Sequence, residues 1–232
     1  MKLLNVPHYQ QPTINDCQGA CAIMVVDFLA GVFDLEHKSR IQQFMKNVGG
    51  AVDSESGQAP PLVTGKVALQ LALLGFSVEF YSIDPYSKST AGLAFLENGP
   101  WNWSPKQIED YAARTSADLS GAMQDVVDVR ERDLSELEIE ELISAGIPVV
   151  AIVDHGTLLG SGSSGPNHAL VITGINMSTV WVQDPNTEST DHIPHDRQYF
   201  FAAHRISGTD CDAYIVSKSL DTRPTTHDEF MQ

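Results

Sequence analysis

Apolar residues recur at spacings of three and four between Cys17 and Gly31, as they do on the buried face of a helix. The residues with this spacing are Ala20, Cys21, Ile23, Met24, Phe28 and Leu29. Asp16 or Asn15 can begin the helix as its N-cap, and Gly31 can end it. The pattern therefore predicts a helix whose first turn contains Cys17.

Two more helices and a strand are predicted in the first half of the chain. A helical stretch around His37 to Val48 leads into the loop GGAVDSESGQAPP, which is rich in glycine, serine and proline. The segment TGKVALQLALLG has the pattern of a helix ended by Gly75, and an alternating strand follows from Phe76 to Ile83. This part of the chain is therefore expected to be a helix followed directly by a strand.

The middle of the chain predicts one or two helices followed by a buried strand, Pro148 to Asp154. Ser135 and Glu138 can form a capping box, and Gly146 is suited to end the helix that they begin. The acidic residues of RERDLSELEIEEL are expected on the solvent-facing side of that helix.

Two strands, HALVITGI and TVWVQDP, are predicted near the C-terminus and are joined by a short turn, Asn176 to Ser178. Because helices precede most of the strands, we expect an α+β fold with an antiparallel sheet. Residues 1–219 are expected to form a single domain, followed by a polar, flexible tail at 220–232.

Composition narrows the classes of protein and partner. The three cysteines lack the pattern of a secreted disulfide framework, and the N-terminus is too polar for a secretory signal. No apolar run approaches the roughly 18 residues that a membrane span needs. The net charge of −16 disfavours nucleic acid and anionic membranes and favours a basic or neutral partner. We therefore expect a cytoplasmic protein.

Cys17 is the candidate nucleophile. A thiol at a helix N-terminus lies beside the positive end of the helix dipole and beside unpaired N–H groups, which favour the thiolate and can stabilise an oxyanion. A free cysteine is otherwise a common core residue, and Cys21, one turn later, is expected to be one. Cys17 is therefore a nucleophile only if a base lies near it.

His168 is the best candidate base because it opens an apolar strand after a Gly/Ser-rich loop. The next strand ends at Asp184, which a hairpin would bring back to the end where His168 enters the sheet. Asp184 could instead be only a turn residue before Pro185, and Asn186 is the alternative group to orient the imidazole. Gln11, six residues before Cys17, is close enough in sequence to donate its amide N–H to the same oxyanion.

These residues resemble the motifs of one enzyme family. The glutamine before DC, the small residues at the helix start, NHALVITGI and VWVQDPN are similar to the C39-like branch of the papain-like cysteine peptidases, in particular the standalone bacterial type. The resemblance implies a papain-like fold, with helices carrying the cysteine and an antiparallel sheet carrying the histidine and aspartate. It also implies Cys17, His168 and Asp184 as a catalytic triad and Gln11 in the oxyanion hole, with no metal or organic cofactor.

The expected activity is hydrolysis of a peptide or amide bond through an acyl-enzyme. The same triad can instead deliver the acyl group to an amine or thiol, which would make the protein an acyl or aminoacyl transferase. A third possibility is a catalytically silent binding module, since Gln18 stands where the family usually has glycine.

Two other segments carry chemistry-bearing residues. DHIPHD contains two histidines and flanking carboxylates, but Pro194 breaks a helical ligand spacing, so we interpret it as a solvated loop rather than a metal site. Trp101 and Trp103 can line a substrate groove or anchor a loop. The segment from Gly156 to Asn167 is a candidate lid because its glycine and serine content permits hinge motion.

Overall fold

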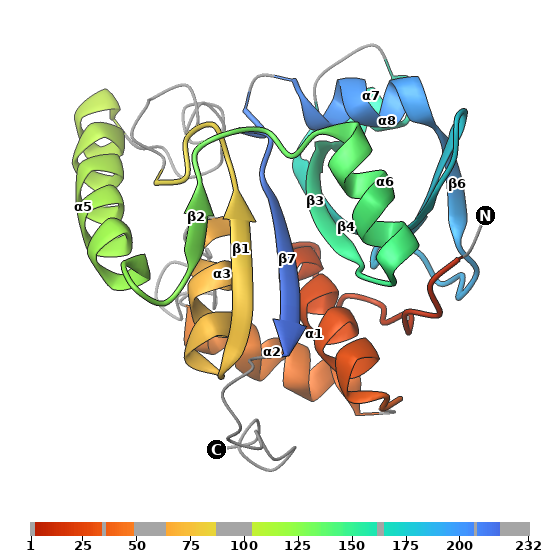
Figure 1. The fold of residues 1–232 in the computed structure, drawn as a ribbon. Coiled ribbons are helices and arrows are strands. Elements are labelled where there is room, and N and C mark those ends of the chain that lie inside the picture. The colour runs from red at the N-terminus through yellow and green to blue at the C-terminus, as the bar shows by residue number, and fades with distance from the viewer. Residues whose placement is uncertain are drawn as a thin grey trace.

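A mixed sheet of seven strands forms the centre of the computed structural model, which describes residues 3–33, 36–48, 64–86, 104–161, 165–206 and 208–218 (Figure 1). The strand order is β2-β1-β7-β3-β4-β5-β6. The strands are β1 (Phe76–Tyr81), β2 (Asp128–Arg130), β3 (Val149–Asp154), β4 (Asn167–Ile175), β5 (Thr179–Gln183), β6 (Ile193–Asp196) and β7 (Ala213–Lys218).

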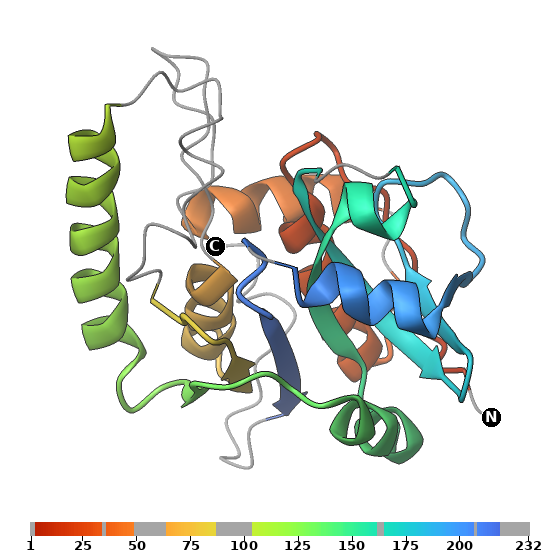
Figure 2. The same cartoon turned by 90° about the horizontal axis from the view of Figure 1, so that it is seen from above.

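Helices cover both faces of this sheet. They are α1 (Cys17–Ala30), α2 (His37–Val48), α3 (Thr64–Leu73), α5 (Pro105–Met123), α6 (Glu136–Ala145), α7 (His155–Leu158) and α8 (Arg197–His204). Figures 1 and 2 show α1, α2 and α3 on one face, α6 and α8 on the other, and α5 at the side beyond β2. The α+β class predicted from the sequence is therefore confirmed.

The sheet is not wholly antiparallel, which corrects the prediction. β2 pairs with β1 in parallel, while the other strand pairs are antiparallel. A parallel neighbour needs a long crossover connection, and the chain between β1 and β2, which includes α5, provides one. β2 is three residues long and largely exposed, so it leaves little hydrophobic periodicity in the sequence.

A second correction concerns DHIPHD. Residues Ile193 to Asp196 form the edge strand β6, not a loop, with Pro194 opposite Trp181. An edge strand tolerates proline because one row of its backbone groups has no strand partner. The alternating burial of β6 is nevertheless the period-2 pattern of an ordinary strand.

The α1 helix begins and ends where the sequence predicted, and Gly31 adopts the left-handed conformation that ends it. Its burial is more extensive than a single face, because every residue from Cys17 to Asp27 is buried. The predicted N-cap bond is absent. The Asp16 carboxylate instead accepts a hydrogen bond from the Thr13 N–H at 2.9 Å, so Asp16 does not cap the first turn of α1 with its side chain.

Several local signals were interpreted correctly. Ser135 and Glu138 form the capping box of α6, and Gly146 ends that helix at a φ of 90°. Gly75 also has positive φ, directly before β1. The turn between β4 and β5 spans residues 176–178 as predicted.

Trp101, Trp103 and the tail at 220–232 lie outside the described residues.

Two features hold α1 against α2. A Cβ atom on Gly19 would lie 2.6 Å from Met45 Cγ, so a larger residue at this position would force the Met45 side chain to shift. Further along, the buried Arg40 guanidinium forms two hydrogen bonds of 2.8 Å with the Asp27 carboxylate. The Tyr9 hydroxyl donates to the same carboxylate at 2.7 Å.

This buried pair predicts a large stability effect. We expect Arg40→Met to lower the free energy of unfolding by about 3–5 kcal/mol, because it leaves the Asp27 charge buried without its partner. Replacing both residues, Asp27→Leu with Arg40→Met, should recover most of that loss. Urea denaturation followed by circular dichroism measures both, with Tyr9→Phe as a milder control. A loss below about 1 kcal/mol for Arg40→Met would contradict this account.

Candidate active site

Three candidate residues meet at one edge of the sheet. His168 is the second residue of β4, and Asp184 directly follows β5. Because β4 and β5 are antiparallel, with Val171 opposite Gln183, the start of one strand lies beside the end of the other. The α1 helix packs against β4 and brings its first residue, Cys17, to the same edge.

His168 and Asp184 are in direct contact. The imidazole Nε2 lies 2.7 Å from Asp184 Oδ1, and both side chains are buried. A carboxylate accepts hydrogen bonds, so Nε2 carries the proton and donates it. The same carboxylate oxygen accepts the backbone N–H of Asn186 at 2.8 Å. Asn186 therefore holds Asp184 through its main chain, and Asp184, not Asn186, orients the imidazole.

The electrostatics of His168 favour its charged form. Burial lowers the pKa of its imidazole, but polar contacts with Asp184 and Cys17, together with charge on both, outweigh this and raise the pKa to about 9. For Asp184, burial raises the pKa of the carboxyl group, because it disfavours the charged form of an acid. Contact with the imidazolium lowers this pKa by more, so the net direction is downward. The pair is therefore arranged as a carboxylate beside an imidazolium, with Cys17 as the third interacting group.

Cys17 combines burial with an uncapped helix start. Its side chain is mostly buried, and the N-cap residue Asp16 makes no side-chain hydrogen bond to the first turn of α1. Such N–H groups attract negative charge on a thiolate or an oxyanion. Cys21 is fully buried, and burial followed by the charges of Cys17 and Asp184 raises its thiol pKa, which agrees with the predicted packing role.

The N-terminal segment runs along β4 and β5 to this edge. The Leu4 N–H donates to the Thr173 carbonyl at 2.8 Å, and His8 Nε2 donates to the Asp184 carbonyl at 2.9 Å. The Gln11 N–H donates to the carbonyl of Pro185 at 2.9 Å. This bond holds the Gln11 backbone beside the loop that carries Asp184. In the sequence, Gln11 precedes Cys17 by six residues.

His155, which the sequence did not place at this site, lies close to it, and His195 interacts with it electrostatically. The His155 ring centroid is 5.1 Å from that of His168, and burial and the His168 charge lower the His155 pKa. The His195 pKa is lowered mainly by burial and responds to both Asp184 and His155. Residues separated this far in sequence carry no joint signal, so only the fold could reveal the cluster.

No metal-binding geometry accompanies these histidines. His192 Nδ1 lies 2.8 Å from the Thr173 hydroxyl, whereas the His195 ring packs near Phe200. Within the described ranges, no group of three His, Cys, Asp or Glu side chains is arranged to hold a metal ion.

The candidate lid is anchored at both of its described ends. Asp154 accepts hydrogen bonds of 2.7 Å from the N–H groups of Thr157 and Gly165. A Cβ on Gly165 would lie 2.4 Å from the Gly156 nitrogen, so the two backbones pass in close contact. Residues 162–164 lie outside the described structure. A lid function stays a prediction.

Comparison with known proteins identifies the family. The family model described as "Peptidase_C39 like family" matches residues 3–206. The chain belongs to the peptidase C39-like family. The matched residues include Gln11, Cys17, His168 and Asp184.

A solved structure supports the fold of this C39-like protein. A crystal structure of a proposed C39-like peptidase from Bacillus anthracis is similar with a TM-score of 0.56 and 14% sequence identity. The match covers 94% of this chain and 98% of that chain. No curated protein sequence gives a significant match. Among the described residues, none of the helices has the length and apolar character to cross a membrane.

The titration of His168 provides a direct test of the site. We expect its imidazole to lose its proton with a pKa of about 9, and to lose it at lower pH in Asp184→Asn, because the carboxylate stabilises the charged ring. NMR of the imidazole Cε1–H resonance measures both values. His192, which is not in contact with Asp184, serves as an internal reference. An unchanged His168 pKa in the variant would show that the contact has no electrostatic effect.

Proposed function

We propose that this C39-like protein is a thiol hydrolase that cleaves a peptide or amide bond through an acyl-enzyme on Cys17. The observation that carries this proposal is the 2.7 Å contact between His168 Nε2 and Asp184, with Cys17 acting on the same imidazole at the uncapped start of α1. A nucleophile, a base and a group that orients the base are the components of such chemistry.

The first half of the reaction forms the acyl-enzyme. His168 Nδ1 holds the proton that the Cys17 thiol has given up, since Nε2 is committed to Asp184. The thiolate attacks the carbonyl carbon and forms a C–S bond, while the carbonyl oxygen becomes an oxyanion. The imidazolium then gives its proton to the leaving nitrogen, the C–N bond breaks, and the amine departs.

The second half returns the enzyme to its starting state. His168 takes a proton from water, the resulting hydroxide attacks the thioester carbonyl, and the C–S bond breaks. The carboxylic acid leaves, and Cys17 is again a thiolate beside the imidazolium. The buried Asp184 holds the imidazole in the same tautomer throughout.

Two donors fit the oxyanion. One is the Cys17 backbone N–H at the first turn of α1, where the Asp16 side chain forms no cap that would compete with an oxyanion. The other is the Gln11 side-chain amide, whose backbone is held beside Pro185 and whose Oε1 is buried without a hydrogen-bond partner in the described part of the chain.

The acceptor of the acyl group distinguishes this proposal from its alternative. A transferase uses the same residues but delivers the acyl group to an amine or thiol instead of water. Action in a reducing, cytoplasmic setting is part of the proposal, and it is supported by Cys17, Cys21 and Cys211 all being free thiols.

Alkylation tests the nucleophile. We expect iodoacetamide to modify Cys17 faster than Cys21 or Cys211 at neutral pH, and His168→Ala to remove that advantage, because the imidazole takes the thiol proton. Peptide mass spectrometry across pH 5–10 measures all three thiols in one sample.

His192→Ala is the matched control, because it removes an imidazole outside the site. If Cys17 reacts no faster than the two other buried thiols and ignores His168→Ala, the protein is better described as a catalytically silent binding module.

The oxyanion role of Gln11 has a separate signature. We expect Gln11→Ala to slow cleavage of a responsive peptide from a blocked peptide library by about 100- to 1000-fold. It should change Cys17 alkylation little, because alkylation generates no oxyanion. Products are identified by mass spectrometry with and without added amines, which separates hydrolysis from transfer. Equal losses in cleavage and alkylation would indicate that Gln11 only supports the local structure.

A further inference from the structure

A second polar cluster lies beside Cys17 and takes no part in the chemistry above. Gln18, the next residue of α1, turns its side chain toward α3, where its Nε2 donates to the Thr64 hydroxyl at 3.4 Å. Asp212, directly before β7, lies within the reach of the same hydroxyl and of Ser82, and both lower the pKa of its carboxyl group. Gln18, Thr64 and Asp212 are thus one connected set of buried side chains.

Two oxygens of this cluster have no partner. Gln18 Oε1 and Asp212 Oδ1 are buried and make no hydrogen bond within the described structure. The direction of the bonds explains which atoms remain, because the Gln18 N–H is used on Thr64 and the Thr64 proton is then free to point at Asp212. Leaving a buried acceptor unpaired costs about 1–3 kcal/mol. Both unpaired atoms are acceptors, so the complementary group must be a donor.

The charges around Asp212 indicate which kind of donor group would fit. The charged groups that shift the Asp212 pKa are Asp210 and Asp84, which are both acids and disfavour a second negative charge. Burial, and then these neighbours, raise the pKa of Asp212 to about 7, against the effect of Ser82 and Thr64. A positively charged group with N–H donors would satisfy both free oxygens and remove the cost of the buried charge.

The cluster of Gln18, Thr64 and Asp212 lies close to Cys17. Gln18 is adjacent to Cys17 in the first turn of α1. Tyr214, the second residue of β7, follows Asp212 by two positions. Burial raises the Tyr214 pKa, and the charges of Cys21 and Cys17 raise it further. The Tyr214 hydroxyl is itself buried without a partner in the described structure.

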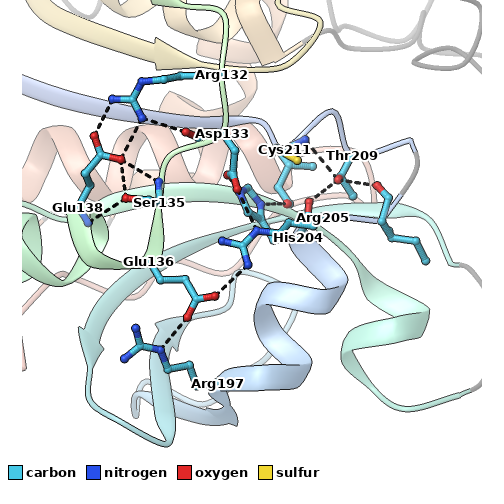
Figure 3. A network of polar contacts seen from close by, with 12 residues as sticks. Arg132, Asp133, Ser135, Glu136, Glu138, Arg197, His204, Arg205, Thr209 and Cys211 are labelled. Carbon is cyan, nitrogen blue, oxygen red and sulfur yellow. Dashed lines mark hydrogen bonds and ion pairs between the residues drawn. The ribbon is translucent and has the colours of Figure 1, made fainter.

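Residues that shortly precede Asp212 in the chain are held by the polar contacts of Figure 3. Arg205 pairs with Asp133 at 2.9 Å, and the Thr209 hydroxyl contacts the His204 carbonyl. The Asp212 carbonyl accepts the Ile152 N–H at 2.9 Å. A recognition group needs such fixed support to hold a constant position relative to the reacting atoms.

We propose that Gln18 and Asp212 bind a positively charged ammonium or guanidinium group of the substrate beside Cys17. This inference rests on the proposed function, since it describes what the thiol hydrolase selects. It also gives a role to Gln18, the residue that replaces the glycine usual in the family. Its side chain supplies an acceptor oxygen next to the nucleophile.

Methanethiosulfonate reagents test the inference at the thiol itself. The Cys17 thiolate attacks the sulfenyl sulfur of the reagent, a mixed disulfide forms, and methanesulfinate leaves. Three reagents of similar size are compared: aminoethyl, which carries N–H donors and charge, trimethylammonioethyl, which carries charge alone, and neutral hydroxyethyl. Rates are normalised to those of N-acetylcysteine amide.

At pH 7.5 we expect the aminoethyl reagent to react with Cys17 about tenfold faster than the other two after normalisation. Asp212→Asn should abolish that preference, and Gln18→Met should reduce it. In the parent protein the preference should fade as the pH falls below about 7, because Asp212 becomes protonated. The general field of the acidic chain acts on both cationic reagents alike and is screened by 0.3 M salt.

Asp125→Asn is the matched control, since it removes one exposed carboxylate at a positive φ that asparagine tolerates. It should leave the preference intact. Equal normalised rates for the three reagents in the parent, or a preference unaltered by both Asp212→Asn and Gln18→Met, would overturn the inference. The neutral reagent reports separately on the proposed function, because its rate depends on the access to Cys17 and on its nucleophilicity, and not on a partner for a positive charge.

Discussion

The burial of α1 against the sheet is the constraint on which the candidate site depends. All residues from Cys17 to Asp27 are buried, so the helix is fixed on every side and its first residue has one position relative to β4. Gly19 lets α2 pack closely against the start of α1. The ion pair between Asp27 and Arg40 joins the two helices nearer the end of α1. A buried ion pair contributes little net stability compared with a well-packed apolar pair, but it strongly penalises any other arrangement. The same geometry that satisfies this pair therefore also holds Cys17 beside His168.

The sheet contributes the second half of the alignment through its hairpin. Antiparallel pairing returns the chain to the edge it left, so the start of β4 and the end of β5 must be neighbours. The N-terminal segment then contacts the Asp184 loop, where His8 binds the Asp184 carbonyl and Gln11 binds that of Pro185. Asp184 is held at its main chain by one segment and at its side chain by Asn186 and His168. Its carboxylate has little freedom to turn away from the imidazole.

The features that the sequence predicts correctly follow from local signals. The features that it does not predict depend on contacts between residues far apart in the chain or leave no local pattern. The α1 helix, the β4–β5 hairpin and the pairing of His168 with Asp184 follow from periodicity, a short turn and strand geometry. The sequence predicts a loop in place of β6, because Pro194 is typical of a break in regular structure, although an edge strand accepts a proline. The parallel strand β2 was missed because three exposed residues leave no pattern. His155 and His195 join the site only through the fold.

The role expected of Gln18 from the sequence differs from the role that its contacts in the structure indicate. In the sequence it is a bulky residue at the helix start, where it could obstruct an oxyanion hole. In the structure its amide turns to Thr64, so it does not supply the missing cap of α1. The first N–H groups of the helix stay available, while Gln18 Oε1 and Asp212 Oδ1 remain unpaired nearby. One end of α1 thus presents donors that suit a developing negative charge and, one residue away, acceptors that suit a positive one. A polar substrate with a cationic group near its reactive carbonyl satisfies both at once.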